Sequence, residues 1–184
     1  MKNDRENIID QLLVMNVQSG DKVSLEKLVQ RWQKRFLQYA VVVTGDSNAA
    51  YDIVQDCWLA IIKGIVKLND PAKFKVWALR IVYNKSATWI RKKQANRKFM
   101  QNFSEYTKEG SGENDQTTQE VRYVLMNLPD KYRSVMTLYY FEKLSISELA
   151  SVFKVPEGTI KSRLYKARDC FKQEWNKKIK GDLK

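Results

Sequence analysis

The segment from Ser145 to Phe171, SISELASVFKVPEGTIKSRLYKARDCF, constrains the fold most because it encodes two short helices joined by a tight turn. Ser145 and Glu148 have the spacing of a capping box, in which each side chain accepts a hydrogen bond from a backbone N–H at the helix start. Pro156 suits the first turn of a second helix but not a helix interior. Apolar residues recur at helical spacing in the sets Ile146, Leu149, Ala150, Phe153 and Ile160, Leu164, Ala167, Phe171. The segment therefore predicts a helix-turn-helix.

The outer face of the second of these helices is polar and basic. Ser162, Tyr165, Lys166 and Asp169 lie opposite its apolar stripe, and this face is flanked by Thr159, Lys161, Arg163 and Arg168. Hydroxyls and lysines can reach phosphates, and arginine can read guanine through two hydrogen bonds, so the face suits a DNA major groove. On the pattern alone, a helical hairpin with a solvated basic face remains the alternative.

Composition narrows the class of protein. The chain has 184 residues, enough for one or two domains, and its seven glycines and three prolines are few enough to favour an all-helical fold. The formal net charge of +12 indicates a polyanionic partner, either nucleic acid or anionic lipid. Histidine is absent. That removes histidine acid–base chemistry and most zinc sites, so we expect no catalytic role, no metal and no cofactor.

The sequence also bears on the compartment. No apolar run approaches the roughly 20 residues that span a membrane, and the polar N-terminus does not resemble a signal peptide. Cys57 and Cys170 are isolated within helical patterns, which favours free thiols in a reducing compartment. We therefore expect a cytoplasmic protein that is not stably inserted in a membrane.

The helix predicted from Asn48 to Leu68 is apolar on two faces. It follows a predicted stop and new cap at residues 44–47, and residues 69–71 end it. One stripe contains Ile53, Cys57, Ala60, Ile61, Gly64 and Leu68, and the second contains Val54, Trp58, Leu59, Ile62 and Val66, with Asp52, Gln55 and Asp56 at its edges. Such a helix is buried on both sides or offers an apolar patch to a partner. The sequence alone leaves both readings open.

The next predicted helix, from about Ala72 to Arg97, is strongly basic. No acidic residue occurs between Pro71 and Ser104, while the basic residues are Lys73, Lys75, Arg80, Lys85, Arg91, Lys92, Lys93, Arg97 and Lys98. Phe74, Trp77, Ala78 and Ile81 form a core stripe in the first half, but Lys85 and Lys92 then fall on the face that should be buried. The second half is therefore expected to leave the core and meet an anion. Tyr83, Asn84 and Trp89 are interleaved with these charges, as in surfaces that stack unpaired bases. A solvated helix end is the alternative.

Residues 104–118 are polar and lack apolar periodicity, so we predict a linker. The expected fold is all-α, with two small helical domains (residues 1–103 and 119–184) joined by this flexible linker. Helices predicted at residues 119–127 and 128–140 complete a four-helix second domain with the helix-turn-helix.

Several segments, in this order along the chain, resemble bacterial RNA polymerase sigma factors of the extracytoplasmic-function (ECF) type. They are TGDSNAAYDIVQDCWLAIIKGI, FKVWALRIVYNKSATWIRKK and LPDKYRSVMTLYYFEKLSISELASVFKVPEGTIKSRLYKAR. Lys143 departs from the family, which often has glycine in the turn before the helix-turn-helix. We expect this departure to cost little if the turn avoids positive φ.

The resemblance implies three sets of contact residues. The set implied to bind the coiled coil of the largest polymerase subunit is Asp52, Val54, Gln55, Asp56, Trp58, Leu59 and Ile62. The set implied to engage the −10 promoter element is Lys73, Arg80, Asn84, Lys85, Thr88, Trp89, Arg91 and Lys92. The set implied to read the −35 element is Glu157, Gly158, Thr159, Lys161, Ser162, Arg163, Lys166 and Arg168.

The resemblance further implies a non-enzymatic subunit that binds core RNA polymerase, recognises promoter DNA, assists its melting and directs initiation. An inhibitory anti-sigma factor is a further partner that the family suggests. Two other classes compete with this interpretation. A dimeric helix-turn-helix regulator would leave the two-faced and basic helices unexplained, and a nucleic-acid-processing enzyme lacks clustered carboxylates suited to magnesium.

Overall fold

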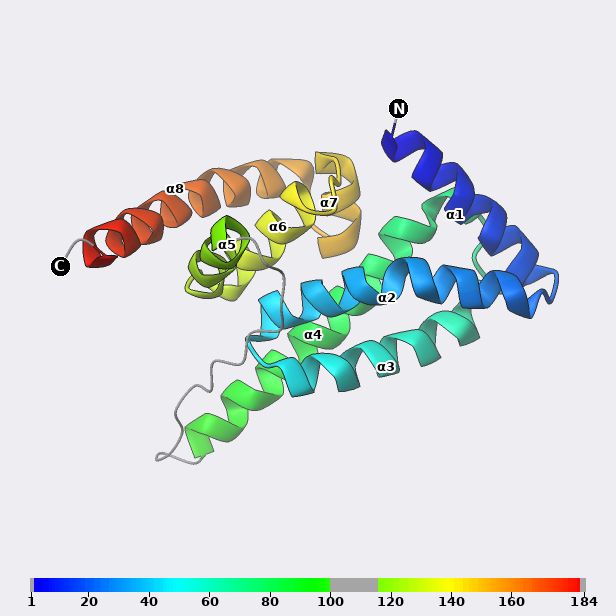
Figure 1. Ribbon diagram of the computed structural model, residues 1–184, viewed down its shortest axis with the longest axis horizontal. Coiled ribbons are helices and arrows are strands. Elements are labelled where there is room, and N and C mark those ends of the chain that lie inside the picture. The colour runs from blue at the N-terminus through cyan, green and yellow to red at the C-terminus, as the bar shows by residue number, and fades with distance from the viewer. Residues whose placement is uncertain (1, 100–115, 183–184) are drawn as a thin grey trace.

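The computed structural model describes residues 2–99 and 116–182, and its elements there are helices joined by turns. In chain order they are α1 (Lys2–Gln18), α2 (Lys22–Thr44), α3 (Ser47–Ile65), the short 3-10 helix η1 (Pro71–Lys73), α4 (Phe74–Phe99), α5 (Gln116–Met126), α6 (Asp130–Tyr140), α7 (Ile146–Phe153) and α8 (Glu157–Asp182). The predicted all-α class is confirmed. The α1–α4 and α5–α8 groups form two helical regions (Figure 1).

The helix boundaries in the first region follow from local chemistry. Gly45 adopts the left-handed conformation with φ 69° and donates its N–H to the Val41 carbonyl, which ends α2. The Asp46 side chain then accepts a hydrogen bond from the Ala49 N–H and starts α3. Asp70 and Pro71 start the 3-10 turn before α4 in the same way. These short polar side chains satisfy backbone donors that a helix start leaves unpaired.

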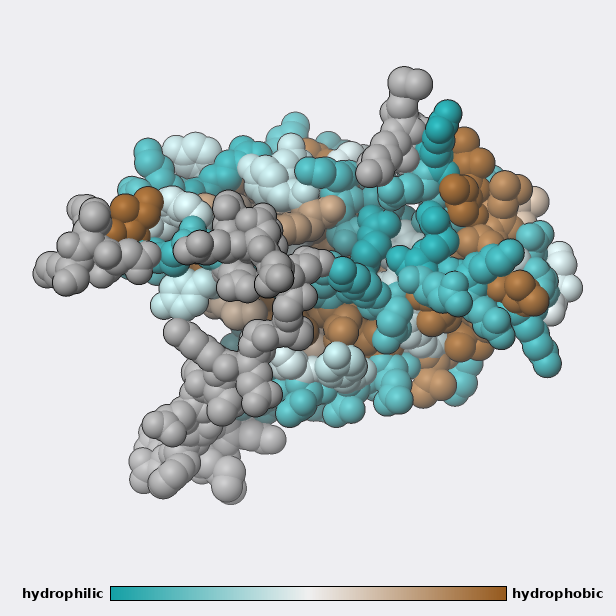
Figure 2. All heavy atoms as spheres, in the orientation of Figure 1, coloured by the Kyte–Doolittle hydropathy of each residue, from teal (hydrophilic) through white to brown (hydrophobic). Residues whose placement is uncertain are grey.

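The core of the first region is built around α2. Trp32, Phe36 and Tyr39 of α2 are almost fully buried, and the Trp32 ring meets the Phe74 ring of α4 edge-on at 5.8 Å between centroids. Hydrophobic burial of such large rings is a main stabilising contribution in a small helical domain. Apolar side chains also gather on the outside over α1 (Figure 2), where Ile8, Ile9, Leu12 and Met15 are exposed.

The second apolar stripe of α3 divides between core and surface, which corrects part of the predicted partner face. Val54 and Trp58 are buried, at 0 and 8% exposure, whereas Leu59 and Ile62 are exposed at 58 and 42%. The Trp58 ring lies against Phe36 of α2 at 5.3 Å, and its indole N–H donates to a side-chain oxygen of α2. In this conformation Val54 and Trp58 are therefore not available to a partner.

The second region contains the predicted helix-turn-helix in α7 and α8. Both hydrogen bonds of the Ser145–Glu148 capping box are present, and Leu149, Ile160 and Leu164 are buried between the helices. The turn before α7 does not avoid positive φ, because Lys143 adopts φ 55°. The low cost was expected only if the turn avoided positive φ, and that condition is not met. A residue with a side chain is strained at positive φ, so Lys143 should cost stability.

The two regions lie in contact. α4 packs against α7, and α2 packs against α6. Tyr83 of α4 meets Phe153 of α7 edge-on, with 4.6 Å between ring centroids. α5 begins at Gln116, so residues 116–118 of the segment predicted as linker are helical, and residues 104–115 lie outside the described residues.

Candidate nucleic-acid interface

A groove of about 830 Å³ runs between α3 and α4. Its lining residues are Asp52, Ile53, Gln55, Asp56, Ile81, Asn84, Lys85, Thr88, Trp89 and Lys92. Three of these belong to the predicted polymerase-binding set and five to the predicted −10 set. The groove thus brings together residues that lie more than 25 positions apart in the chain, and the Lys85 ammonium donates a hydrogen bond to the Asp56 carboxylate at 3.1 Å.

The groove exists because α4 carries buried apolar residues in its first half and exposed polar residues in its second half. Phe74, Ala78 and Val82 are buried, but Asn84 and Thr88 replace apolar residues on the side facing α3 and are exposed. Burial raises the pKa of the adjacent Cys57 thiol to about 12, so that side chain remains neutral. The ionised groups that line the groove are Asp52, Asp56, Lys85 and Lys92.

Cationic side chains continue along α4 beyond the groove. Lys93 lies 4.5 Å from the Trp89 ring centroid and also pairs with Asp46 at 3.0 Å. Arg91 donates to the Thr88 hydroxyl at 3.2 Å, which holds two predicted −10 residues side by side. Arg91 is therefore exposed on α4, whereas Lys93 is half-buried and directed towards Asp46, before the first residue of α3.

Other residues of the basic segment lie outside the groove. Lys73 belongs to η1 and pairs with Asp70 at 3.2 Å, outside the groove, and Arg80 is half-buried. Lys75 is buried at 7% exposure, and desolvation lowers its pKa. Tyr83, which the sequence suggested for base stacking, is covered by Phe153. The aromatic side chain of α4 that lines the groove is Trp89.

The second candidate surface is the N-terminal half of α8. Glu157, Gly158, Lys161, Ser162 and Lys166 are exposed, while Thr159 and Arg163 are half-buried. Arg168 is exposed but donates to the Tyr140 hydroxyl at 2.8 Å, which directs it towards α6. Tyr165 was absent from the predicted contact set, yet it is 75% exposed between Ser162 and Lys166. The sequence did contain a signal for Tyr165, namely its position on the outer face of the predicted helix.

Two further observations concern the described residues. Within residues 2–99 and 116–182, the carboxylates and thiols form no cluster of three that could hold a metal ion. In the same part of the chain, no helix combines the length and apolarity needed to cross a membrane.

Models of known protein families match both helical regions. Residues 28–96 match Sigma-70 region 2, and residues 118–171 match Sigma-70, region 4. The chain is 25% identical over 175 residues to the ECF RNA polymerase sigma factor SigW of Bacillus subtilis, covering 88% of this chain and 94% of that protein. It is 28% identical over 181 residues to the ECF RNA polymerase sigma-E factor of Escherichia coli K12, covering 90% of this chain and 93% of that protein.

Solved structures share the fold. The sigma factor RpoE, in complex with the anti-sigma factor NepR from Bartonella quintana, aligns with a TM-score of 0.73 at 19% identity over 83% of this chain and 96% of that chain. CnrH, in complex with the cytosolic domain of CnrY, aligns with a TM-score of 0.68 at 23% identity over 90% of this chain and 96% of that chain.

These matches define a sigma-70 protein with regions 2 and 4. More specifically, the chain belongs to the ECF sigma factors, and it directs promoter-specific transcription initiation by RNA polymerase. Sigma factors are regulatory rather than catalytic subunits.

Proposed function

We propose that the three actions of this sigma factor map onto three surfaces. The exposed side of α3, with Asp52, Gln55, Asp56, Leu59 and Ile62, binds the largest-subunit coiled coil of core polymerase. Val54 and Trp58 support this surface from within. The groove and the exposed side of α4 engage the −10 element, and the first half of α8 reads the −35 element as duplex.

The observation that carries this proposal is the shared groove. Its polar and basic side chains from α4 face carboxylates and an amide of α3, so polymerase contact and −10 contact are neighbours on one surface. Trp89 supplies a ring on which an unpaired base can stack. Capture of an unstacked base offsets an unstacking cost of a few kcal/mol and favours the melted promoter.

The proposal extends to organisation and partners. We propose domains at residues 1–103 and 119–184, and the two family matches leave residues 97–117 between them. The protein acts as a non-catalytic subunit, without a cofactor, on DNA in the cytoplasm. Because RpoE was solved with an anti-sigma factor, we also propose an inhibitory partner of this kind.

Run-off transcription tests the proposal. Core RNA polymerase from the source bacterium is mixed with the protein and fragmented genomic DNA, and new start sites are mapped. Leu59→Asp places a charge on the proposed polymerase face and should abolish the new starts. Val23→Asp is the matched control, because Val23 is 55% exposed at the start of α2 and belongs to none of the three proposed contact sets.

Two results would contradict the proposal. Leu59→Asp could initiate as well as wild type, which would remove α3 from the polymerase interface. Alternatively, the protein could fail to bind polymerase and instead footprint a palindrome by itself, as a dimeric regulator would.

A further inference from the structure

The first helix, α1, presents an apolar side to solvent. On its inner side, Arg31 of α2 donates to the buried Asp10 carboxylate at 2.8 Å. The Gln18 amide donates to the backbone carbonyls of Ile65 and Leu68 at 2.9 and 2.8 Å, which ties the end of α1 to the end of α3. On the outer side, four large apolar side chains are 44 to 56% exposed; they form the α1 face and are Ile8, Ile9, Leu12 and Met15. A surface helix normally turns polar residues to water, so an apolar outer side indicates contact with another molecule.

The α1 face is continuous and carries no charge. The other exposed residues between Asn7 and Gly20 are neutral as well. Single apolar residues are common on protein surfaces, but these four lie on adjacent turns of one helix. Together they expose roughly 400 Å² of surface, which is the size of a functional apolar patch on a monomer.

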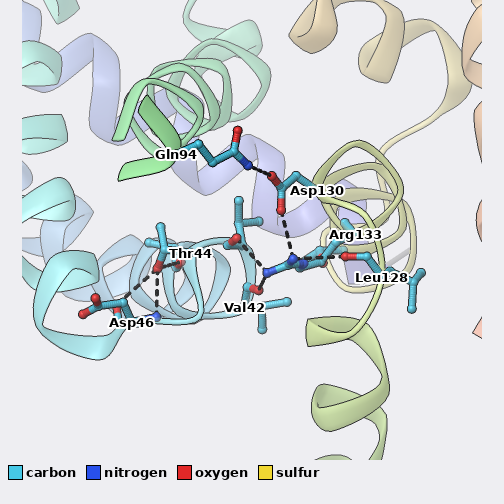
Figure 3. Close-up of polar contacts among 10 residues, drawn as sticks. Val42, Thr44, Asp46, Gln94, Leu128, Asp130 and Arg133 are labelled. Atoms are coloured by element: carbon cyan, nitrogen blue, oxygen red, sulfur yellow. Dashed lines mark hydrogen bonds and ion pairs between the residues drawn. The ribbon is translucent and has the colours of Figure 1, made fainter. Parts of the chain in front are cut away.

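The α5–α8 region leaves the α1 face open. Arg35 of α2 donates to the Glu142 carboxylate at 3.0 and 2.6 Å. At the C-terminal end of α2, Arg133 of α6 donates to the carbonyls of Val42 and Val43 at 3.3 and 2.9 Å (Figure 3). With both contacts in place, apolar side chains still gather on the outside over α1 (Figure 2). The second region therefore covers α2 but not the α1 face.

Charge distinguishes the molecules that could cover this face. The whole chain has a net charge of +12, but residues 2–21 contain two basic residues and four acidic ones. DNA and anionic lipid bind where cations are concentrated, and α1 does not provide such a surface. Two copies of a cationic protein repel each other least where the local charge is not positive. A second copy of this chain is therefore the partner that the charge distribution favours.

Opposite charges lie at the two ends of the α1 face. Arg5 is exposed before it, and Asp21 is exposed after it. In an antiparallel pair of α1 helices, a two-fold axis midway between these residues passes beside Leu12. Arg5 of each copy then lies over the Asp21 end of the other, and the two Leu12 side chains face each other. Helices commonly pack within about 20° of antiparallel, so this pairing is an ordinary one.

We propose that the α1 face is a self-association surface, through which two copies of the free protein form an antiparallel dimer. The pair buries on the order of 800 Å², below the roughly 1,200–2,000 Å² of stable interfaces, so the dimer is weak and depends on concentration. The four residues of the α1 face belong to none of the three proposed contact sets. The inference thus goes beyond the proposed function and does not rest on it.

Sedimentation equilibrium of the purified protein, over about 5 to 500 μM, tests the dimer. The average mass of wild type should rise with concentration from 21.6 kDa towards twice that value. Leu12→Glu and Leu12→Lys should each remain monomeric, because two like charges meet at the axis. An equal mixture of these two variants should dimerise again, because opposite charges then meet there. Non-specific aggregation through an apolar surface would not give this restoration.

Ile179→Glu is the matched control. Ile179 is 45% exposed on α8, in the other helical region, so a charge there should leave the dimer unchanged. Circular dichroism verifies that each variant is folded, as expected for substitutions at exposed positions.

Three results would overturn the proposal: a wild-type mass of 21.6 kDa at every concentration, dimerisation that both Leu12 variants retain, or a mixture of the variants that stays monomeric. If wild type is monomeric, loss of polymerase binding by Leu12→Glu would assign the α1 face to polymerase. Loss of binding to phosphatidylglycerol vesicles would assign it to a membrane surface. The mass is measured without polymerase or DNA, so its outcome is separate from that of run-off transcription.

Discussion

Lys85 and Asp56, one from each of the two facing helices, share a hydrogen bond of 3.1 Å across the α3–α4 groove. Lys85 belongs to the proposed −10 set and Asp56 to the proposed polymerase set. Their side chains are 42 and 62% exposed, so the pair adds little to stability. Its consequence concerns binding, since a phosphate must compete with Asp56 for the lysine.

Lys85→Ala should weaken binding of single-stranded −10 DNA by the polymerase complex without unfolding the protein. The loss of one phosphate contact should reduce the slope of log affinity against log salt by about 0.7. A salt titration with a fluorescent oligonucleotide measures this slope. Lys63→Ala, at the far end of α3, is the control for net charge. An unchanged slope would show that Lys85 does not reach a phosphate.

Trp58 and Leu59 are adjacent, but substitution should affect the stability of the protein strongly at Trp58 and weakly at Leu59. Trp58→Ala removes a buried ring that packs on Phe36, and it should lower the free energy of unfolding by about 3–5 kcal/mol. Leu59→Ala, at an exposed position, should change that free energy by less than about 0.5 kcal/mol. Urea denaturation compares them. Similar losses for both would contradict the burial pattern of α3.

These adjacent residues illustrate what the sequence can and cannot predict. Apolar spacing, caps and breakers predicted the order of the helices from α3 onward and the helix-turn-helix, because those signals are local. The periodicity of α3 revealed two apolar stripes, but which residues a neighbour covers depends on how far α2 extends over them. The contact between Arg35 and Glu142 spans 107 positions and left no local pattern. Tyr83 was assigned to base stacking for the same reason, since its partner comes from the other region.

Two lysines adopt conformations that favour glycine. Lys143 and Lys154 have φ 55° and 53°, and Lys154 occupies the C-cap of α7. Left-handed backbone costs a residue with a side chain about 1–2 kcal/mol, partly offset by the greater freedom of unfolded glycine. Lys143→Gly and Lys154→Gly should therefore each stabilise the protein by roughly 0.5–1 kcal/mol.

Lys172→Gly provides the control for these substitutions, because Lys172 is exposed in the interior of α8. There glycine should destabilise by about 1 kcal/mol. Thermal unfolding of the three variants measures the contrast. A loss of stability in all three would show that the turn conformations carry no strain.

Gly64 and Gly158 are both helical but differ in the space around them. A methyl group added at Gly64 would lie 2.8 Å from a Trp77 ring atom, whereas one at Gly158 would meet nothing within 4 Å. Gly64→Ala should destabilise by about 1 kcal/mol, because overpacking exceeds the gain in helix propensity. Gly158→Ala should stabilise by about 0.5–1 kcal/mol. Chemical denaturation distinguishes the two signs, and stabilisation by Gly64→Ala would mean that Trp77 moves freely.

Asp46 should make stability depend on pH. The Ala49 N–H donates to its carboxylate, and this bond, together with Lys93, holds the pKa of Asp46 below its ordinary value of 3.8. A lowered carboxylate pKa in the folded state contributes stability above pH 4, and that contribution is lost as the pH falls through the folded pKa. Asn can still cap the helix but cannot carry the charge.

Asp46→Asn should therefore be less stable than wild type at pH 7 by up to about 1 kcal/mol, since the side chain is partly solvated. The difference should shrink as the pH is lowered from 5 to 3. Urea unfolding at several pH values measures it, with Asp52→Asn on the same helix as the control for net charge. A difference that stays constant or grows towards pH 3 would show that the Asp46 carboxylate is not favoured by folding.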